Sequence, residues 1–83
     1  MSIEDQYLVL GSILKKNELL ATSDLQKTDF VSKWCQAIFV QLARNYKHGI
    51  TSDVLSVWSG IQEFGEHELV ESLADIATLL DWG

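Results

Sequence analysis

Apolar residues recur every three or four positions along most of the chain, and no proline interrupts the pattern. This spacing is the period of an α-helix, and a chain without proline can keep its helices unbroken. No window of five or more residues alternates convincingly between apolar and polar side chains, so strands are not expected. The sequence therefore predicts an all-α fold, in which residues 1–83 form one compact domain of about five helices.

Polar caps and a glycine mark the first three predicted helices. Ser2 is placed to cap the first helix, and a shorter second helix is expected from about Asn17 to Leu25. The third is the clearest, because Ser32 can cap it and Gly49 can stop it after Lys47. The inward-facing residues of the first helix are expected to be Ile3, Tyr7, Leu8, Leu10, Ile13 and Leu14. Those of the third are Trp34, Cys35, Ala37, Ile38, Phe39, Leu42 and Tyr46, and this broad apolar surface predicts the buried centre of the domain.

Two further helices are expected after Ile50. Ser52 or Asp53 can cap the fourth, which ends before Gly65 and contains Gly60 as either a close-packing point or an early end. Acidic residues favour the positive end of a helix, so Glu66 and Glu68 are expected to open the fifth. The residues predicted to face inward there are Leu69, Val70, Leu73, Ala74, Ile76, Ala77 and Leu80.

The charge is divided unevenly along the chain. All six basic residues lie between positions 15 and 47, whereas the twelve acids divide into five before residue 50 and seven after it. The second part therefore has no base and accounts for the formal net charge of -6. Because nucleic-acid backbones attract Lys and Arg, we expect no direct nucleic-acid binding and a role in protein docking instead.

The residues that usually carry chemistry are sparse. No glycine precedes a lysine, so no Walker A loop can hold ATP phosphates. Cys35, His48 and His67 are too few for a structural zinc site, and Cys35 lies among apolar neighbours that predict a core position. We therefore expect no catalytic residue, no metal site and no cofactor in this domain.

The expected cell compartment is the cytoplasm. A single cysteine cannot form an internal disulfide, and the acidic start lacks the basic region of a signal peptide. No apolar run approaches the roughly 20 residues that cross a bilayer, so no membrane association is expected.

Three tryptophans are many for the core of a chain of this size, and tryptophan is a common anchor of protein interfaces. Trp34 and Trp58 are expected to be core residues, with an interface role as the alternative. Trp82 either packs back on the domain or begins a segment that continues further. The candidate protein interface consists of Trp34, Trp58, Leu80 and Trp82.

The order of short motifs resembles the N-terminal domain of the DnaB-type replicative helicases. Glu4 followed by Val9-Leu10-Gly11-Ser12-Ile13-Leu14 is similar to the family's opening helix, and LQKTDF at positions 25–30 is similar to its L-x-x-x-DF turn. The remaining matches are Ile38-Phe39, Tyr46, Gly49, Asp53, Gly65, Leu73, Ala74 and Ala77, without a gap from about residue 3 to 79. The departures are Cys35, where the family usually has His, Thr51-Ser52 in place of Pro-Ile, and Glu71-Ser72 in place of Gly-Gly. They place the chain as a divergent member, as in phage, prophage or plasmid systems.

The resemblance implies an orthogonal helical bundle that serves as a non-catalytic collar on a hexameric ring. Its implied partners are copies of itself, the primase and the helicase loader. The ATP- and Mg-dependent motor, a RecA-like domain that moves 5' to 3', has no counterpart in residues 1–83.

Two alternatives remain beside the helicase domain. The chain could be a complete small protein that imitates the collar domain and regulates a host helicase, since its Met lies just before the first motif. It could also be the helicase-binding domain of a primase, although the DF turn and the Gly49-to-Asp53 spacing match the helicase better. An independent enzyme is the weakest interpretation.

Overall fold

Helices α1 (Ile3–Lys15) and α3 (Lys33–Lys47) begin at the serine caps expected from the sequence. The computed structural model describes residues 1–82, so Gly83, the last residue of the predicted domain, lies outside the described part. Ser2 Oγ accepts a hydrogen bond from the Asp5 backbone N–H at 3.1 Å, and Ser32 Oγ accepts one from the Cys35 N–H at 3.3 Å. Gly49 has a φ of 71°, a left-handed conformation that glycine adopts without strain.

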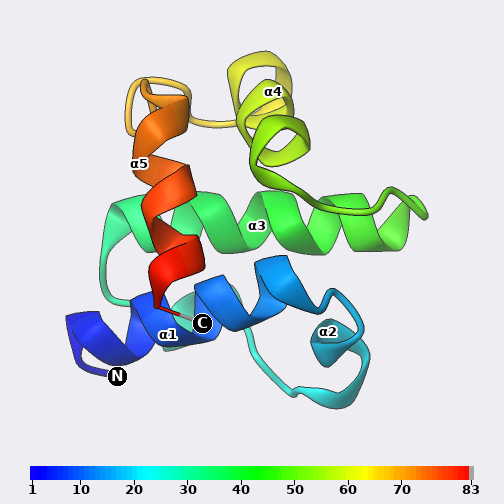
Figure 1. Cartoon of the computed structure of the whole chain (residues 1–83), viewed down its shortest axis with the longest axis vertical. Helices are drawn as coiled ribbons and strands as arrows, with labels where there is room; N and C mark the ends of the chain where they lie inside the picture. Colours follow the sequence, from blue (N-terminus) through cyan, green and yellow to red (C-terminus); the bar gives the residue numbers. More distant parts are fainter. Residues whose placement is uncertain (83) are drawn as a thin grey trace.

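The other elements surround these two helices. They are α2 (Leu19–Thr22), η1 (Lys27–Asp29), α4 (Val54–Phe64), α5 (Leu73–Ala77) and η2 (Thr78–Asp81), where η denotes a 3₁₀ helix. Helix α3 packs on both α1 and α4, while α5 and η2 run back from α4 so that η2 lies on α1 (Figure 1). The described residues contain no strand, and the predicted all-α helical bundle is confirmed.

The core follows the predicted apolar faces closely. Its fully buried members include Leu10 and Ile13 of α1, Ile38 and Leu42 of α3, and Ile76 of α5. Cys35 is also completely buried, as predicted. Three expected inward-facing residues are instead exposed, each to 44%: Ile3 and Leu8 on α1, and Tyr46 near the end of α3. All three belong to apolar faces that are wider than the area their neighbours cover.

The prediction for the second helix was too long. Helix α2 ends at Thr22 because Ser23 has an extended backbone, with φ -100° and ψ 147°. The chain then forms the separate turn η1, where Gln26 and Asp29 satisfy each other's backbone N–H groups in a capping box.

The predicted start of the fifth helix was also wrong. Helix α5 begins at Leu73, whereas Glu66 and Glu68 lie in an exposed turn. Val70 and Ile76 are buried as expected, but Leu69, Leu73, Ala74 and Leu80 are exposed. Leu79, which the sequence interpretation left out, is buried in their place.

Helix α4 resolves the two alternatives that the sequence left open. Asp53 is its N-cap, with Oδ1 accepting from the Ser56 N–H at 2.7 Å, while Ser52 is buried one residue earlier. The helix continues through Gly60, where a Cβ atom would collide with the side-chain amide of Gln41. Gly60 is therefore a close-packing point between α4 and α3.

The cap of the central helix makes a testable contribution to stability. Replacing Ser32 by Ala removes the acceptor for the Cys35 N–H and is expected to lower the free energy of unfolding by about 1 kcal/mol. Urea denaturation followed by circular dichroism measures this change. Ser59→Ala, at an exposed site within α4, is the control and should leave the unfolding free energy within about 0.5 kcal/mol of the parent. Equal midpoints for the two variants would show that the Ser32 cap has no stabilising role.

Candidate protein interface

Two of the four predicted interface residues meet around a tyrosine of α1. Trp34 is half-buried on α3, and its ring lies 6.0 Å from that of Tyr7 at an interplanar angle of 89°. Trp82 is 40% exposed, and its ring lies 5.6 Å from Tyr7 at an angle of 53°. Trp82 thus packs back on the domain, and the three rings line a surface pocket of about 290 Å³ together with Asp75, Thr78 and Leu79. Residues from α1, α3 and the C-terminal helices form this aromatic pocket.

The other two predicted residues lie elsewhere. Leu80 is 39% exposed on η2 but does not line the aromatic pocket. Trp58 is half-buried on α4, and its Nε1–H donates to the backbone carbonyl of Glu71 at 3.1 Å. From the same helix, Gln62 Nε2 donates to the carbonyl of Val70 at 2.6 Å. Trp58 therefore holds the segment before α5 against α4, and its hydrogen bond to Glu71 serves the fold.

This contact can be tested by a conservative change. Trp58→Phe keeps an aromatic ring but loses the N–H donor to Glu71, so the free energy of unfolding should fall by about 1 kcal/mol. Limited proteolysis should also cut residues 65–72 faster than in the parent chain. Leu55→Ala, at an exposed position of α4, is the control for a surface change on this helix. Unchanged stability and unchanged proteolysis in Trp58→Phe would contradict the structural role of the indole.

A shallow apolar groove lies between α1 and the chain that follows it. Leu8, Val9 and Ile13 supply one wall, and the opposite side comes from α2 and the following turn. The complete lining is Leu8, Val9, Ser12, Ile13, Leu19, Thr22, Ser23 and Leu25, and the volume is about 350 Å³. No charged residue lines it. The exposure of Leu8, which the sequence placed in the core, is explained by its position on this groove.

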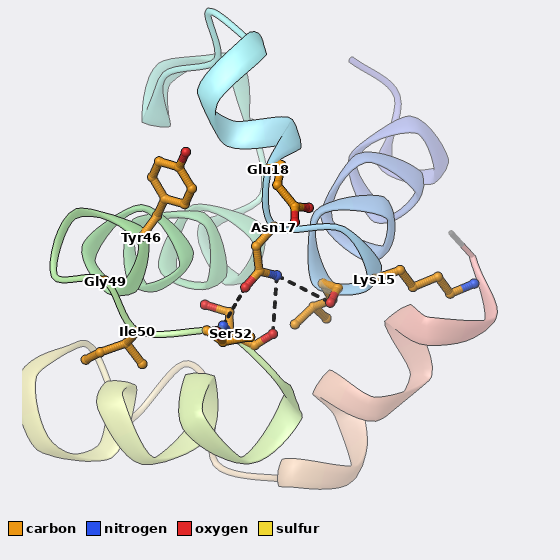
Figure 2. Close-up of a pocket in the computed structure, with 9 residues that line it drawn as sticks. Lys15, Asn17, Glu18, Tyr46, Gly49, Ile50 and Ser52 are labelled. Carbon is orange, nitrogen blue, oxygen red and sulfur yellow. Dashed lines mark hydrogen bonds between the residues drawn. The ribbon is translucent and has the colours of Figure 1, made fainter.

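A chain of buried and half-buried polar side chains joins the end of α1 to the start of α4. Asn17 Oδ1 accepts from the Ser52 N–H at 2.6 Å, and Asn17 Nδ2 donates to the Ser52 carbonyl at 3.3 Å (Figure 2). Asn17 Nδ2 also donates to the carbonyl of Ile13 at 2.8 Å. Ser52 Oγ accepts from Asn45 Nδ2 at 3.1 Å, and Asn45 Oδ1 accepts from Gln41 Nε2 at 2.9 Å. Asn17 and Ser52 also line the adjoining pocket of about 340 Å³, so two of its polar side chains already make hydrogen bonds within the fold.

Sequence reasoning missed this network, as it missed Gln6. The Gln6 side chain is buried, and its Oε1 accepts from the backbone N–H groups of Val31 and Ser32, both at 3.1 Å. These polar residues stand at positions that would otherwise belong to the buried helix faces. The sequence did contain a signal for these residues, namely an amide side chain within an apolar helix face. Such a side chain is buried only if it finds hydrogen-bond partners in the core.

Three of the basic residues border another hollow, of about 300 Å³, between α3 and the end of α4. These are Lys27, Lys33 and Arg44, with Glu66 on the same rim. The Arg44 guanidinium carbon lies 4.3 Å from the centre of the Phe64 ring, which is a cation–π contact between α3 and α4. The Arg44 side chain therefore serves in part to cover an exposed aromatic ring.

The Cys35 thiol lies in the core rather than on the surface. Burial raises the pKa of the Cys35 thiol, and the hydrogen bond with Ser32 only partly offsets this, so the thiol is held away from the reactive thiolate form. His48 and His67 are both exposed. Among residues 1–82, no three His, Cys, Asp or Glu side chains gather in a way that could hold a metal ion. Within that part of the chain, no helix combines the length and the apolar character needed to cross a membrane.

The succession of helices described above, from α1 to η2, can be compared with known families. The family model for the DnaB-like helicase N-terminal domain matches residues 1–82. The chain belongs to this family. No curated protein and no solved structure gives a significant match. The family resemblance inferred from the motif order is therefore correct, and the helicase N-terminal domain accounts for every element that the structure describes.

Proposed function

We propose that this domain acts as the N-terminal collar of a replicative DNA helicase, in which it associates with copies of itself and docks the primase or the helicase loader. The match of the DnaB-like N-terminal family over residues 1–82 is the observation that carries the proposal. A collar domain works by presenting surfaces to other proteins, so it needs stable helices and exposed contact residues rather than reactive groups.

The distribution of exposed side chains supports a docking role. Large apolar residues that are at least 38% exposed occur on several elements, and they include Leu8, Leu55, Phe64, Leu80 and Trp82. Apolar and aromatic residues of this kind supply the anchors of protein interfaces. The one cysteine is not among these surface residues, since it is buried in the core.

Charge supports a basic protein partner rather than a nucleic acid. Residues 50–83 contain seven acids and no base, and the acids of the described part of that segment are exposed on α4, α5, η2 and their connections. Such a surface repels phosphate backbones and attracts a partner with a positive patch. We propose that the primase or loader supplies this patch, that the domain binds no nucleic acid directly, and that ATP and Mg²⁺ serve the motor of a parent helicase.

Self-association is the part of the proposal that the purified chain can test directly. Size-exclusion chromatography with light scattering, run from about 10 µM to 1 mM, is expected to show a mass that rises above the 9.4 kDa of one chain. Addition of the cognate primase or loader should produce a separate complex peak. A chain that stays monomeric at the highest concentration and also leaves both partners unshifted would contradict the proposed function.

A further inference from the structure

The aromatic pocket has the composition of a site for an organic cation. Tyr7, Trp34 and Trp82 line one surface hollow, and Asp75, which carries a carboxylate, lines it as well. Tyr7 contacts both indoles, since its ring centre is 6.0 Å from Trp34 and 5.6 Å from Trp82. The faces of aromatic rings are negative, so they attract ammonium and guanidinium groups, and a nearby carboxylate adds direct charge attraction.

The rings do not all serve to fill the core. Trp34 and Tyr7 are half-buried and pack against the core, but Trp82 remains 40% exposed. A hollow of about 290 Å³ is left between these rings and the end of α5. This is enough room for the head group and part of the stem of one basic side chain.

The surroundings favour a positive occupant. The pocket wall from α5 and η2 belongs to the part of the chain that has no basic residue, and Asp81 is also exposed on η2. Lys33, the neighbour of Trp34 in the sequence, lines the separate hollow beside Arg44 rather than the aromatic pocket. Among residues 1–82, no basic side chain lines the aromatic pocket.

We propose that the pocket formed by Tyr7, Trp34, Trp82 and Asp75 binds the side chain of an arginine or lysine from a partner protein. That the occupant is a protein side chain rests on the proposed docking function. That the pocket binds a cation does not depend on that function. The head group enters the hollow that Tyr7, Trp34 and Trp82 line, and the Asp75 carboxylate pairs with its charge. This gives docking a specific anchor within a broadly acidic surface.

Nuclear magnetic resonance can test the pocket with a small probe. In ¹⁵N-labelled protein the three indole N–H signals report separately on Trp34, Trp58 and Trp82. Titration with Nα-acetyl-arginine amide is expected to move the Trp34 and Trp82 signals with a dissociation constant on the order of 1–10 mM, and to leave Trp58 in place. The matched neutral probe, Nα-acetyl-citrulline amide, has nearly the same shape and should bind at least fivefold more weakly. Equal binding of the two probes, or equal movement of all three indoles, would overturn the proposal.

Variants assign the binding to the pocket. Asp75→Asn and Trp82→Leu should each weaken binding of the arginine probe at least fivefold, while Glu68→Gln, an exposed acid of the turn before α5, should not change it. Asp75 is exposed, so its variant keeps the test valid even if the loss of Trp82 disturbs the packing. Full affinity in Asp75→Asn would overturn the role of the carboxylate.

Two further measurements identify the source of the cation. Tighter binding of tetramethylammonium than of the arginine probe would indicate a free quaternary ammonium ligand and would overturn the protein occupant. The protein occupant would also be overturned if Asp75→Asn weakened binding of the arginine probe but left the affinity for the primase, the loader and a second copy of the chain unchanged. If none of these proteins binds the parent chain while the arginine probe does, the proposed docking function fails and the cation pocket remains.

Discussion

Asn17→Ala is expected to lower the free energy of unfolding by about 3 kcal/mol, because this one amide makes hydrogen bonds that join the end of α1 to the start of α4. Its Oδ1 accepts from the Ser52 N–H, and its Nδ2 donates to the carbonyls of Ile13 and Ser52. Alanine provides neither a donor nor an acceptor, so backbone groups at the end of α1 and the start of α4 lose their partner. In a domain of this size the loss corresponds to a decrease of about 15 °C in Tm.

Thermal and urea denaturation measure this effect, and the neighbouring residue supplies the control. Glu18→Gln alters an exposed side chain beside Asn17 and should leave the unfolding free energy within about 0.5 kcal/mol of the parent. A second variant, Asn45→Ala, removes the hydrogen bond to Ser52 Oγ in the same network. Its loss of unfolding free energy should lie between those of Glu18→Gln and Asn17→Ala. If Asn17→Ala matched Glu18→Gln, the polar network would not hold α4 in place.

Reversing charge in the acidic turn before α5 is expected to slow association with a basic partner about tenfold at low ionic strength. Glu68→Lys combined with Glu71→Lys changes two exposed residues and reverses the local sign of the surface. Neither carboxylate takes part in a hydrogen bond that holds the fold: Trp58 donates to the backbone carbonyl of Glu71, which the substitution keeps. Stopped-flow mixing with labelled primase or loader measures the association rate.

The matched control changes the same number of charges in the other part of the chain. Glu18→Lys combined with Asp24→Lys gives a protein of the same net charge, but the altered residues lie around α2, in the half that is nearly neutral. If both double variants slow association equally, net charge alone controls the rate. Such a result would contradict the assignment of docking to the acidic half.

The parts of the fold that could be predicted are those fixed by local chemistry. Ser2 and Ser32 cap α1 and α3 through contacts three residues away, and Gly49 takes the left-handed conformation that few other residues adopt. The burial of Ile38 and Leu42 followed from helical periodicity in the same way. Each of these features depends on neighbours in the sequence, so one sequence was enough to find it.

The start of α5 could not be predicted because it depends on contacts between distant residues. The acids and apolar residues from position 66 onward have the composition of a helix start. In the structure, however, Gln62 and Trp58 of α4 bind the carbonyls of Val70 and Glu71, which would otherwise bond within a helix. Tertiary hydrogen bonds thus override a helical pattern that is real but weak.

The candidate interface was predictable in composition but not in arrangement. The sequence singled out Trp34 and Trp82, yet it gave no reason to place Tyr7 between them or Asp75 beside them. Those contacts arise because η2 folds back onto α1, a contact between the two ends of the domain (Figure 1). The function of these residues as an interface stays a prediction.

The central proposal, that this DnaB-like N-terminal domain docks other proteins, is tested most directly by partner binding. Biolayer interferometry with the immobilised chain should detect the cognate primase or loader with a micromolar or tighter dissociation constant, an affinity that weakens as salt is raised and in the Asp75→Asn variant. Absence of binding by both partners up to about 100 µM, together with a chain that stays monomeric, would contradict the account.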